Sequence, residues 1–340
     1  MTAPPVKVSV LAIPETAGWM LYGMYDVLNS VGTIWPELTT GQPGEPRMEV
    51  RIVAATAEPF SCWGEVPVAP QAALDDVTAT DVVCVPEMTI PGDESPVGRY
   101  PREAAWLDRM YAGGATIASA CSGAFLLADA GLLDCQESTT HWTYDARFKH
   151  YYPQVKLRVE RVLCLAGDDR RIVTAGGASS WHDLCLHLIA RFCGVHEAIN
   201  TAKAFLFEEH DSGQLCFAAM SPPPRHDDAV VGGCQRWLAD HCAEPHPIAR
   251  MIERSGLTPR TFARRFRTAT GYTPIDYVRS LRVEEAKQSL ETTGDTIDEI
   301  GREVGYDDPA SFRRLFKRKT GLTPSHYRRK LGPRRVWTTS

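Results

Sequence analysis

The sequence lacks long hydrophobic runs and closely spaced cysteine pairs. No apolar run approaches the ~18 residues that a membrane-spanning helix needs. The N-terminus has no basic segment followed by a long apolar stretch, so no signal peptide is predicted and we expect a cytoplasmic protein. The 10 cysteines are scattered singly, and none forms a C-x-x-C pair. We therefore expect reduced thiols, with no disulfide framework, no metal site and no bound cofactor.

Basic residues are scarce in the first part of the chain and abundant in the last. Before Pro245 there are 17 lysines and arginines against 31 acidic residues, and from Pro245 onward there are 20 against 11. This division favours a nucleic-acid-binding module fused to an acidic body. Charge alone also fits a solvated basic surface, so the pattern within the basic region must decide.

Short apolar segments alternate with amphipathic segments through about residue 200. Buried strands are predicted at 7–13, 49–54, 81–86, 116–120 and 171–175. Helices are predicted at 18–31, 103–112, 124–130 and 180–192. Strands that alternate with helices predict a parallel α/β sheet.

A proline-rich segment separates this part from an entirely helical one. The three consecutive prolines at 222–224 cannot continue a helix or a central strand. We therefore predict an α/β domain over 6–210, a linker over 211–228 and a helical domain over 229–331.

The helical region contains an internal repeat with a 50-residue offset. Its first copy reads Phe262-x-x-x-Phe266-Arg267-x-x-Thr270-Gly271-x-Thr273-Pro274-x-x-Tyr277, and the second copy begins at Phe312. Each copy predicts two short helices around a turn, the second helix starting after Thr258 or Asp308. A single helix over 275–290 joins the copies and would place two recognition helices about one DNA turn, ~34 Å, apart. The alternative is an arginine-rich helical bundle with solvated faces.

The helical region closely resembles the DNA-binding domain of the AraC/XylS family. The resemblance rests on Ile300-Gly301, Val304-Gly305-Tyr306, Ser311 to Lys317 and Gly321 to Arg328, with Gly301 where alanine is usual. It places the family's base-facing positions on Arg260, Ala263, Arg264, Ala310, Arg313 and Arg314. Arginine there can bind guanine edges, whereas Arg267, Lys317, Arg318 and Lys319 are expected to neutralise phosphates. Thr261 and Ser311 complete the predicted DNA-binding set.

In the α/β region, Cys121-Ser122-Gly123 follows a short apolar strand and precedes a helix immediately. This arrangement has the geometry of a nucleophile elbow, in which the helix N-terminus favours a thiolate. His141 is a candidate neighbour of the cysteine. The segment 179–183 holds serine, histidine and aspartate, but residues adjacent in sequence do not predict a converging triad.

Residues 6–195 resemble the DJ-1/PfpI-like class I glutamine amidotransferase superfamily. The elbow and its continuation to Asp134, Thr139-Thr140-His141-Trp142 and Thr174-Ala175-Gly176-Gly177 carry this resemblance. It implies a flavodoxin-like sandwich. Protease-like members have a histidine after the elbow cysteine, where this chain has Ser122. The acidic partner of the cysteine in DJ-1-like members would fall near Met20.

Together these features predict a DNA-binding transcriptional regulator, specifically a metabolite-responsive activator and not an enzyme. Its partners would be double-stranded DNA, a small-molecule effector, a second copy of the chain and, as a candidate, RNA polymerase. The candidates for the effector pocket are Cys121, Ser122, His141, Trp142, Trp19 and Trp181, whose aromatic rings would suit a quaternary ammonium ligand. Two alternatives are a purely structural dimerisation domain and a cysteine-dependent small-molecule hydrolase or hydratase with an appended DNA-binding module.

Overall fold

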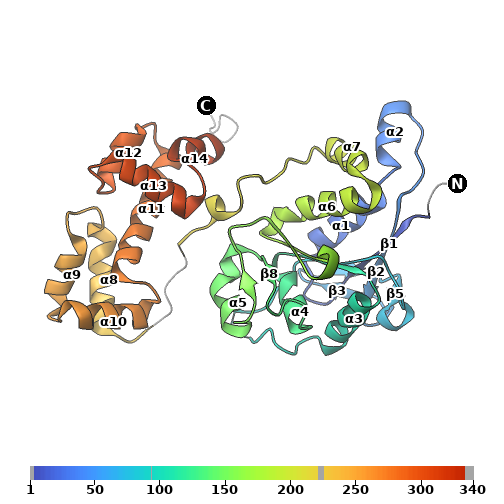
Figure 1. Ribbon diagram of the computed structural model, residues 1–340, viewed down its shortest axis with the longest axis horizontal. Helices are drawn as coiled ribbons and strands as arrows, with labels where there is room; N and C mark the ends of the chain where they lie inside the picture. The colour runs from blue at the N-terminus through green and yellow to red at the C-terminus, as the bar shows by residue number, and fades with distance from the viewer. Residues whose placement is uncertain (1–3, 93, 221–225, 334–340) are drawn as a thin grey trace. The chain divides into compact units, whose positions relative to one another are not determined.

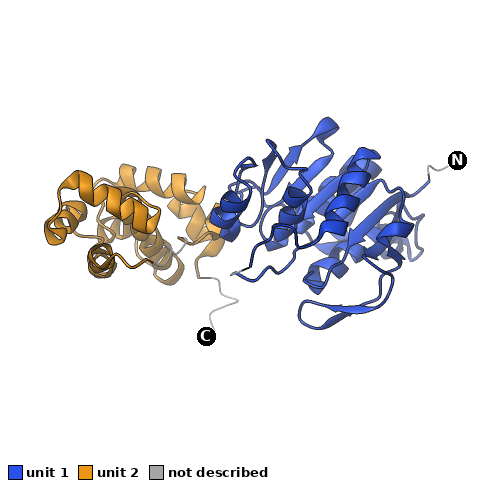
Figure 2. Cartoon of the chain, turned by 90° about the horizontal axis from the view of Figure 1, so that it is seen from below, with its two compact units in different colours: residues 1–214 blue, residues 215–340 orange. Residues whose placement is uncertain are grey.

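The computed structural model describes residues 4–92, 94–220 and 226–333. The chain divides into two compact units, residues 1–214 and 215–340 (Figure 2). This division falls within the predicted linker, 211–228. The prolines at 222–224, on which that prediction depends, lie outside the described residues.

The first unit is built on a seven-stranded sheet in the order β10-β11-β7-β6-β1-β2-β5. Its strands are β1 (Val6–Leu11), β2 (Met48–Ala54), β5 (Ala72–Ala73), β6 (Val82–Val85), β7 (Thr116–Ala120), β10 (Leu163–Ala166) and β11 (Ile172–Ala175). Two small strand pairs lie outside it, β3 (Phe60–Cys62) with β4 (Val66–Val68), and β8 (Glu137–Ser138) with β9 (Lys156–Leu157).

The sheet is parallel except at its β10 edge. Val8 on β1 pairs with Val50 on one side and with Val82 on the other. The exception is β10, which runs antiparallel to β11. The five predicted strands all pair in parallel, and β10 is an additional strand that the sequence did not predict. The segment between the two strands is too short for a crossover, which needs a dozen or more residues, so it can only form a hairpin.

Helices cover both faces of the sheet (Figure 1). One core contains residues of α1 (Gly18–Asn29), α6 (Trp181–Cys193) and α7 (Val195–Phe205). The opposite core contains residues of α3 (Pro101–Ala112), α4 (Ala124–Asp129) and α5 (Asp145–Tyr151). A short helix, α2 (Ile34–Thr40), has no buried residue. Apolar strands buried on both faces require two helical layers, and the predicted flavodoxin-like sandwich is confirmed.

The second unit is entirely helical in its described part, as predicted. Its helices are α8 (Ala229–His241), α9 (Pro247–Ser255), α10 (Pro259–Thr270), α11 (Pro274–Thr292), α12 (Ile297–Glu303), α13 (Pro309–Thr320) and α14 (Pro324–Leu331). Local chemistry determines where they start. Thr258, Thr273, Asp308 and Thr323 each accept backbone N–H hydrogen bonds from the first turn and are followed by proline.

Two separate apolar cores stabilise this unit, and α11 contributes to both. Tyr277 and Val278, near its start, pack in a core with Phe262 and Phe266. Val283 and other residues further along the helix pack in a core with Phe312 and Phe316. The two halves of the repeat are therefore joined by one continuous helix.

Over the described ranges, no helix combines the length and apolar character needed to cross a bilayer.

Candidate nucleic-acid interface and elbow site

The chain turns sharply where β7 meets α4, as predicted for the elbow. Cys121 adopts the left-handed conformation, with φ of 55°, which costs energy in a residue with a side chain. Gly123 passes so close to β6 that a Cβ atom there would lie 2.5 Å from the carbonyl oxygen of Val85. A larger residue at 123 would therefore push the two segments apart.

The Cys121 thiol is buried and lies beside a carboxyl group. Glu87, which follows β6, lies close enough to the thiol to interact with it electrostatically. Burial raises the pKa of Cys121 far above its ordinary value, and the charge of Glu87 raises it further. Burial also raises the pKa of Glu87. The expectation of a thiolate is wrong because desolvation outweighs the dipole of α4, which has only six residues.

The family resemblance would put the acidic partner near Met20, whereas the carboxyl group beside Cys121 belongs to Glu87. The two positions are neighbours in the structure, since Met20 Sδ accepts a hydrogen bond from the Glu87 backbone N–H. The carboxyl itself comes from the neighbouring parallel strand. The available signal was an acidic residue directly after the apolar run 81–86, at the same edge of the sheet as Cys121.

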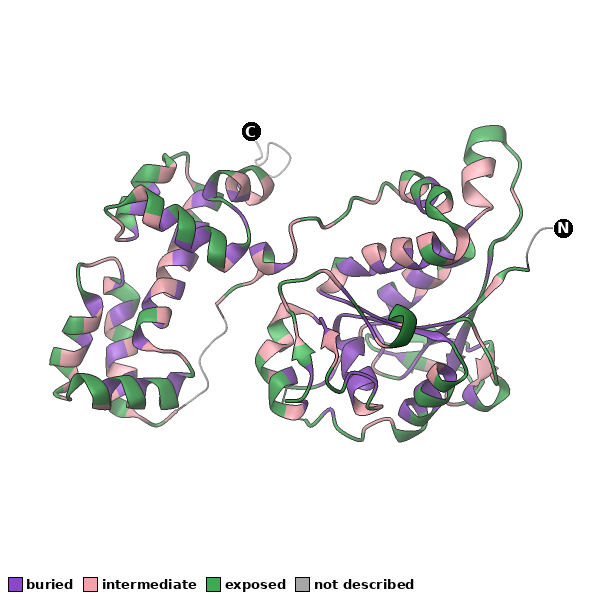
Figure 3. Cartoon of the chain, viewed as in Figure 1, coloured by how far each residue is buried: buried purple, intermediate pink, exposed green. Residues whose placement is uncertain are grey.

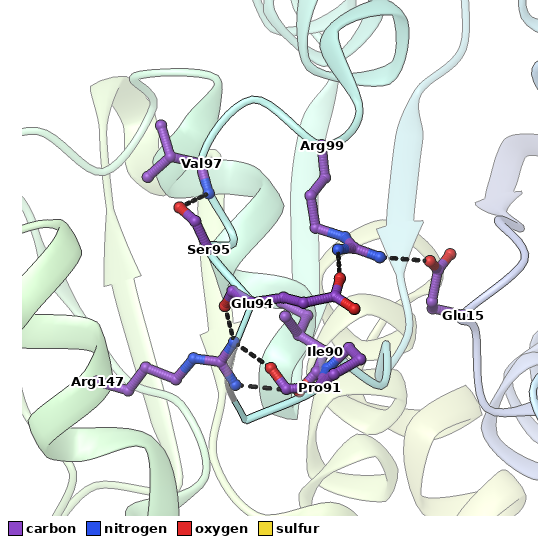
Figure 4. A network of polar contacts seen from close by, with 8 residues as sticks. All are labelled: Glu15, Ile90, Pro91, Glu94, Ser95, Val97, Arg99 and Arg147. Atoms are coloured by element: carbon purple, nitrogen blue, oxygen red, sulfur yellow. Dashed lines mark hydrogen bonds and ion pairs between the residues drawn. The ribbon is translucent and has the colours of Figure 1, made fainter.

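The loop that carries Glu87 is held by arginines and by Ser122. Ser122 Oγ donates to the Met88 carbonyl at 2.6 Å and accepts from the Met88 N–H at 3.0 Å. Arg147 donates to the carbonyls of Ile90, Pro91 and Glu94, and Arg99 pairs with Glu94 and with Glu15 (Figure 4). These contacts hold Glu87 against Cys121.

Four of the six candidate pocket residues come together at this edge. Tyr144 lies close enough to Cys121 and Glu87 to interact with both electrostatically. The ring centroid of His141 is 6.2 Å from that of Tyr144 and 5.3 Å from that of Trp142. Burial lowers the pKa of His141, which keeps the ring neutral near neutral pH. We call Glu87, Cys121, Ser122, His141, Trp142 and Tyr144 the elbow cluster.

Trp19 and Trp181 do not join the elbow cluster. The Trp181 ring is buried against α1, where it occupies the space beside Gly23. Trp19 lies on α1 with 49% of its surface exposed. Across the described ranges, no ring contact joins any two of Trp19, Trp142 and Trp181, so they form no common aromatic wall. The same ranges hold no group of three or more histidine, cysteine or acidic residues suited to a metal ion.

Alkylation tests the state of the elbow cysteine. We expect iodoacetamide to modify the exposed Cys135 in the native protein at neutral pH and to leave Cys121 unmodified. A buried thiol with a raised pKa offers little thiolate to an electrophile. Mass spectrometry of tryptic peptides measures both sites, and unfolding in guanidinium before labelling serves as the control. Modification of native Cys121 at the rate of Cys135 would contradict this assignment.

The two helix-turn-helix units present matching recognition helices, α10 and α13. Phe262, Phe266, Phe312 and Phe316 are at most 1% exposed and fix the inner faces of these helices. The exposed outer faces, visible in Figure 3, carry Arg260, Ala263, Arg264 and Arg267 on α10, and Ala310, Arg313, Arg314 and Lys317 on α13. Thr261 and Ser311 are half-buried at the start of each helix. A groove of about 580 Å³ runs along α10 past Ala263, Arg264 and Arg267 to Thr273 and Pro274.

The arginines of the two recognition helices differ in their partners. Arg313 pairs with Asp298 at 2.6 Å, and Arg314 contacts Asp308 at 3.7 Å. In the described part of the chain, no hydrogen bond or ion pair engages Arg264. The pairs on α13 are at least 50% exposed, so solvent and salt screen them and each can open for DNA.

Two other basic residues of the unit are used within the fold. Arg265 makes a bidentate pair with Asp228, which also caps α8. Lys319 is half-buried, donates to Ser280 Oγ at 3.2 Å, and burial lowers its pKa. The expectation that Lys319 contacts phosphate is therefore not supported, because its ammonium group joins α13 to α11.

Comparison with known families matches both units. Residues 6–191 match the DJ-1/PfpI family, and residues 251–330 match a family described as a helix-turn-helix domain. The chain belongs to the DJ-1/PfpI family, and its C-terminal helix-turn-helix domain is of the AraC type.

Individual relatives match large parts of the chain. The chain is 25% identical to the HTH-type transcriptional regulator CdhR of Pseudomonas aeruginosa over 298 residues, 86% of this chain and 85% of the relative. It is 30% identical to the HTH-type transcriptional regulator GlxA of Rhizobium meliloti over 219 residues, 60% of this chain and 62% of the relative. It is 27% identical to the isonitrile hydratase of Pseudomonas putida over 197 residues, 57% of this chain and 75% of the relative.

These findings identify the chain as a helix-turn-helix transcriptional regulator of the AraC type. The alternative of a cysteine-dependent hydrolase or hydratase with an appended DNA-binding module is not favoured.

Proposed function

We propose that this regulator is a metabolite-responsive activator that binds its operator as a homodimer. The proposal rests on the two exposed recognition helices α10 and α13, which carry arginines. The helix-turn-helix units to which they belong are joined by α11. Arg260, Ala263, Arg264, Ala310, Arg313 and Arg314 would face bases, with Thr261 and Ser311 beside them, and Arg267 and Lys317 would contact phosphates. Bound in the cytoplasm beside a promoter, the dimer would act by contacting RNA polymerase.

The elbow cluster is the proposed effector site. In an open α/β sheet, ligands bind outside the carboxyl ends of the parallel strands, where this cluster lies. Glu87, His141 and Trp142 are partly exposed there and would meet the effector first, whereas Cys121 and Ser122 are buried behind them. Trp19 and Trp181 are left out of this site.

Gln214, the last residue of the first unit, offers a route by which the effector site can influence DNA binding. Its side chain is buried among the loops around the elbow. Nε2 donates to the Thr140 carbonyl at 2.8 Å, and Oε1 accepts from the Gly177 and Trp142 N–H groups at 3.0 and 3.2 Å. Thr140 in turn donates through Oγ1 to the Cys121 carbonyl at 2.7 Å. An effector that moves these loops would pull on the residue directly before the second unit, which begins at Leu215.

Removal of the Gln214 side chain tests this route. Gln214→Ala leaves the Gly177 and Trp142 N–H groups without their acceptor, so we expect the first unit to lose about 1–3 kcal/mol of stability. Calorimetry of the full chain should show a lower melting temperature for the first unit and an unchanged melting temperature for the second unit. In a reporter strain, we expect the response to growth conditions to be lost while operator affinity is retained.

The exposed residue Gln42 provides the matched control. Gln42→Ala makes the same chemical change, and we expect it to alter neither stability nor response. A Gln214→Ala protein with wild-type stability and response would show that this residue does not couple the units.

Selection of operator DNA from random sequence tests the proposed function directly. We expect the full chain to enrich paired half-sites whose centres lie about 10 base pairs apart, one per helix-turn-helix unit. Affinity measured by mobility shift should fall steeply between 50 and 200 mM salt, because bound phosphates release counterions. Failure to enrich any sequence, or binding that does not respond to salt, would contradict the proposal. A thermal-shift screen of metabolites against the full chain would then identify the effector by stabilisation.

A further inference from the structure

Ser179, Asp183 and His210 form a polar relay near the start of α6. His210 comes from the chain that follows α7, and its ring lies between Ser179 and Asp183. Ser179 Oγ lies 3.1 Å from His210 Nε2, and Asp183 Oδ2 lies 2.7 Å from His210 Nδ1. Asp183 Oδ1 also accepts the His210 backbone N–H at 3.0 Å. The sequence showed Ser179 and Asp183 only as neighbours, because their histidine is 27 residues beyond Asp183.

The donor and acceptor roles in this relay follow from chemistry. An ionised aspartate can only accept, so His210 Nδ1 must carry the proton in the contact with Asp183. In the neutral ring Nε2 is then the acceptor, and Ser179 Oγ–H is its donor. This is the arrangement in which a histidine removes a proton from a serine hydroxyl while an aspartate fixes its tautomer.

Burial is graded along the relay in the way that nucleophilic catalysis requires. The Asp183 side chain is 9% exposed and the His210 side chain 22%, whereas Ser179 is exposed. The carboxylate is therefore shielded and the hydroxyl is open to a reactant. Ser179 also lies two residues before the first residue of α6, whose free N–H groups and dipole would favour negative charge on a bound oxygen.

An apolar groove adjoins the relay. His210 and Asp183 line a cavity of about 590 Å³ between β10, α6 and α7, within the size range of small-molecule sites. Its other walls are mainly apolar and include Leu163, Leu186, Ile199 and Phe207. A groove of this character suits a hydrocarbon chain attached to the group that reacts at Ser179.

We propose that Ser179, His210 and Asp183 form a second functional site, which hydrolyses carboxylic esters with an apolar acyl chain. Ser179 Oγ bonds to the acyl carbon and its proton passes to His210 Nε2. The imidazolium returns that proton to the leaving alkoxide as the ester C–O bond breaks. Water then attacks the acyl-serine, giving one proton to His210. That proton returns to Ser179 Oγ as the acid is released, while Asp183 stays ionised throughout.

The site would give the regulator a way to consume an ester signal. It lies outside the proposed DNA-binding function, and neither depends on the other.

Labelling with a fluorophosphonate probe and hydrolysis of p-nitrophenyl butyrate test the proposal on the full chain. We expect the probe to be found on Ser179 by peptide mass spectrometry and the ester to be hydrolysed above the buffer rate. Ser179→Ala should abolish both signals, and Asp183→Asn should slow labelling at least tenfold. Ser212→Ala, a serine change in the nearby chain at a partly exposed position, should change neither.

Absence of labelling at Ser179, or hydrolysis that persists in Ser179→Ala, would overturn the proposal. Thermal melting of each variant shows whether the fold is intact. Operator binding by Ser179→Ala, measured in parallel, should equal that of the unaltered chain. Loss of the esterase signal with retained DNA binding therefore separates this site from the regulator function.

Discussion

Replacement of Arg264 by alanine is expected to weaken operator binding by about 1–3 kcal/mol, roughly five- to 150-fold. Arg264 projects from the exposed face of α10, and no described partner competes for its guanidinium group. Its full capacity to bind a guanine edge is therefore available to DNA. Mobility-shift titrations against the selected operator and against single-base variants would measure both affinity and specificity.

The pattern across base variants identifies what Arg264 contacts. We expect Arg264→Ala to relax discrimination at one position of the first half-site. Equal weakening on every sequence would instead assign Arg264 to a phosphate. Arg51→Ala, which removes the same charge from an exposed strand position in the first unit, is the control and should leave affinity unchanged. Arg314→Ala should cost less than Arg264→Ala, because Arg314 must first leave Asp308 and Ser311.

Replacement of Phe316 by alanine should have the largest effect on stability. The Phe316 side chain is fully buried, with its ring centroid 5.8 Å from that of Phe312 and 5.3 Å from that of Tyr327. Removal of a buried phenyl ring costs about 3–5 kcal/mol, which is a large part of the stability of a small helical core. Denaturant unfolding followed by circular dichroism would measure the loss.

A second aromatic residue provides the control for Phe316. Phe217 is 45% exposed, and Phe217→Ala should cost far less. If Phe316→Ala unfolds the second helix-turn-helix unit, footprinting should show protection of the first half-site only. Retention of both footprints and of wild-type stability would show that this core does not hold α13 in place.

Helices of the second unit were predictable from sequence because their ends are encoded locally. Thr258, Asp308 and the glycines at 271 and 321 start or stop helices through contacts within a few residues. The predicted starts after Thr258 and Asp308 are confirmed, and the predicted joining helix over 275–290 agrees with α11 to within two residues. The repeat then implied two similar cores. The elbow at Cys121 was predictable for the same reason, since a strand, a small residue and a helix follow one another directly.

Contacts between distant segments were not predictable. Glu87 reaches Cys121 from another strand, and His210 reaches Asp183 from beyond the next helix. The burial of Cys121 was also not predictable, because nothing in a short apolar run shows that the thiol beside it is almost wholly removed from water. For that reason the predicted thiolate at Cys121 was wrong. Lys319 was assigned to phosphate because its sequence position does not reveal its contact with Ser280.

The shared helix α11 restricts which promoters the protein can serve. With 19 residues it is about 28 Å long, and both ends are buried in cores, so it offers no hinge between the two recognition helices. Insertion of five base pairs between half-sites would rotate one of them to the far side of the duplex, beyond the reach of the second unit. Operators of this regulator are therefore free to drift in the bases between the contacted positions, but not in the number of those bases.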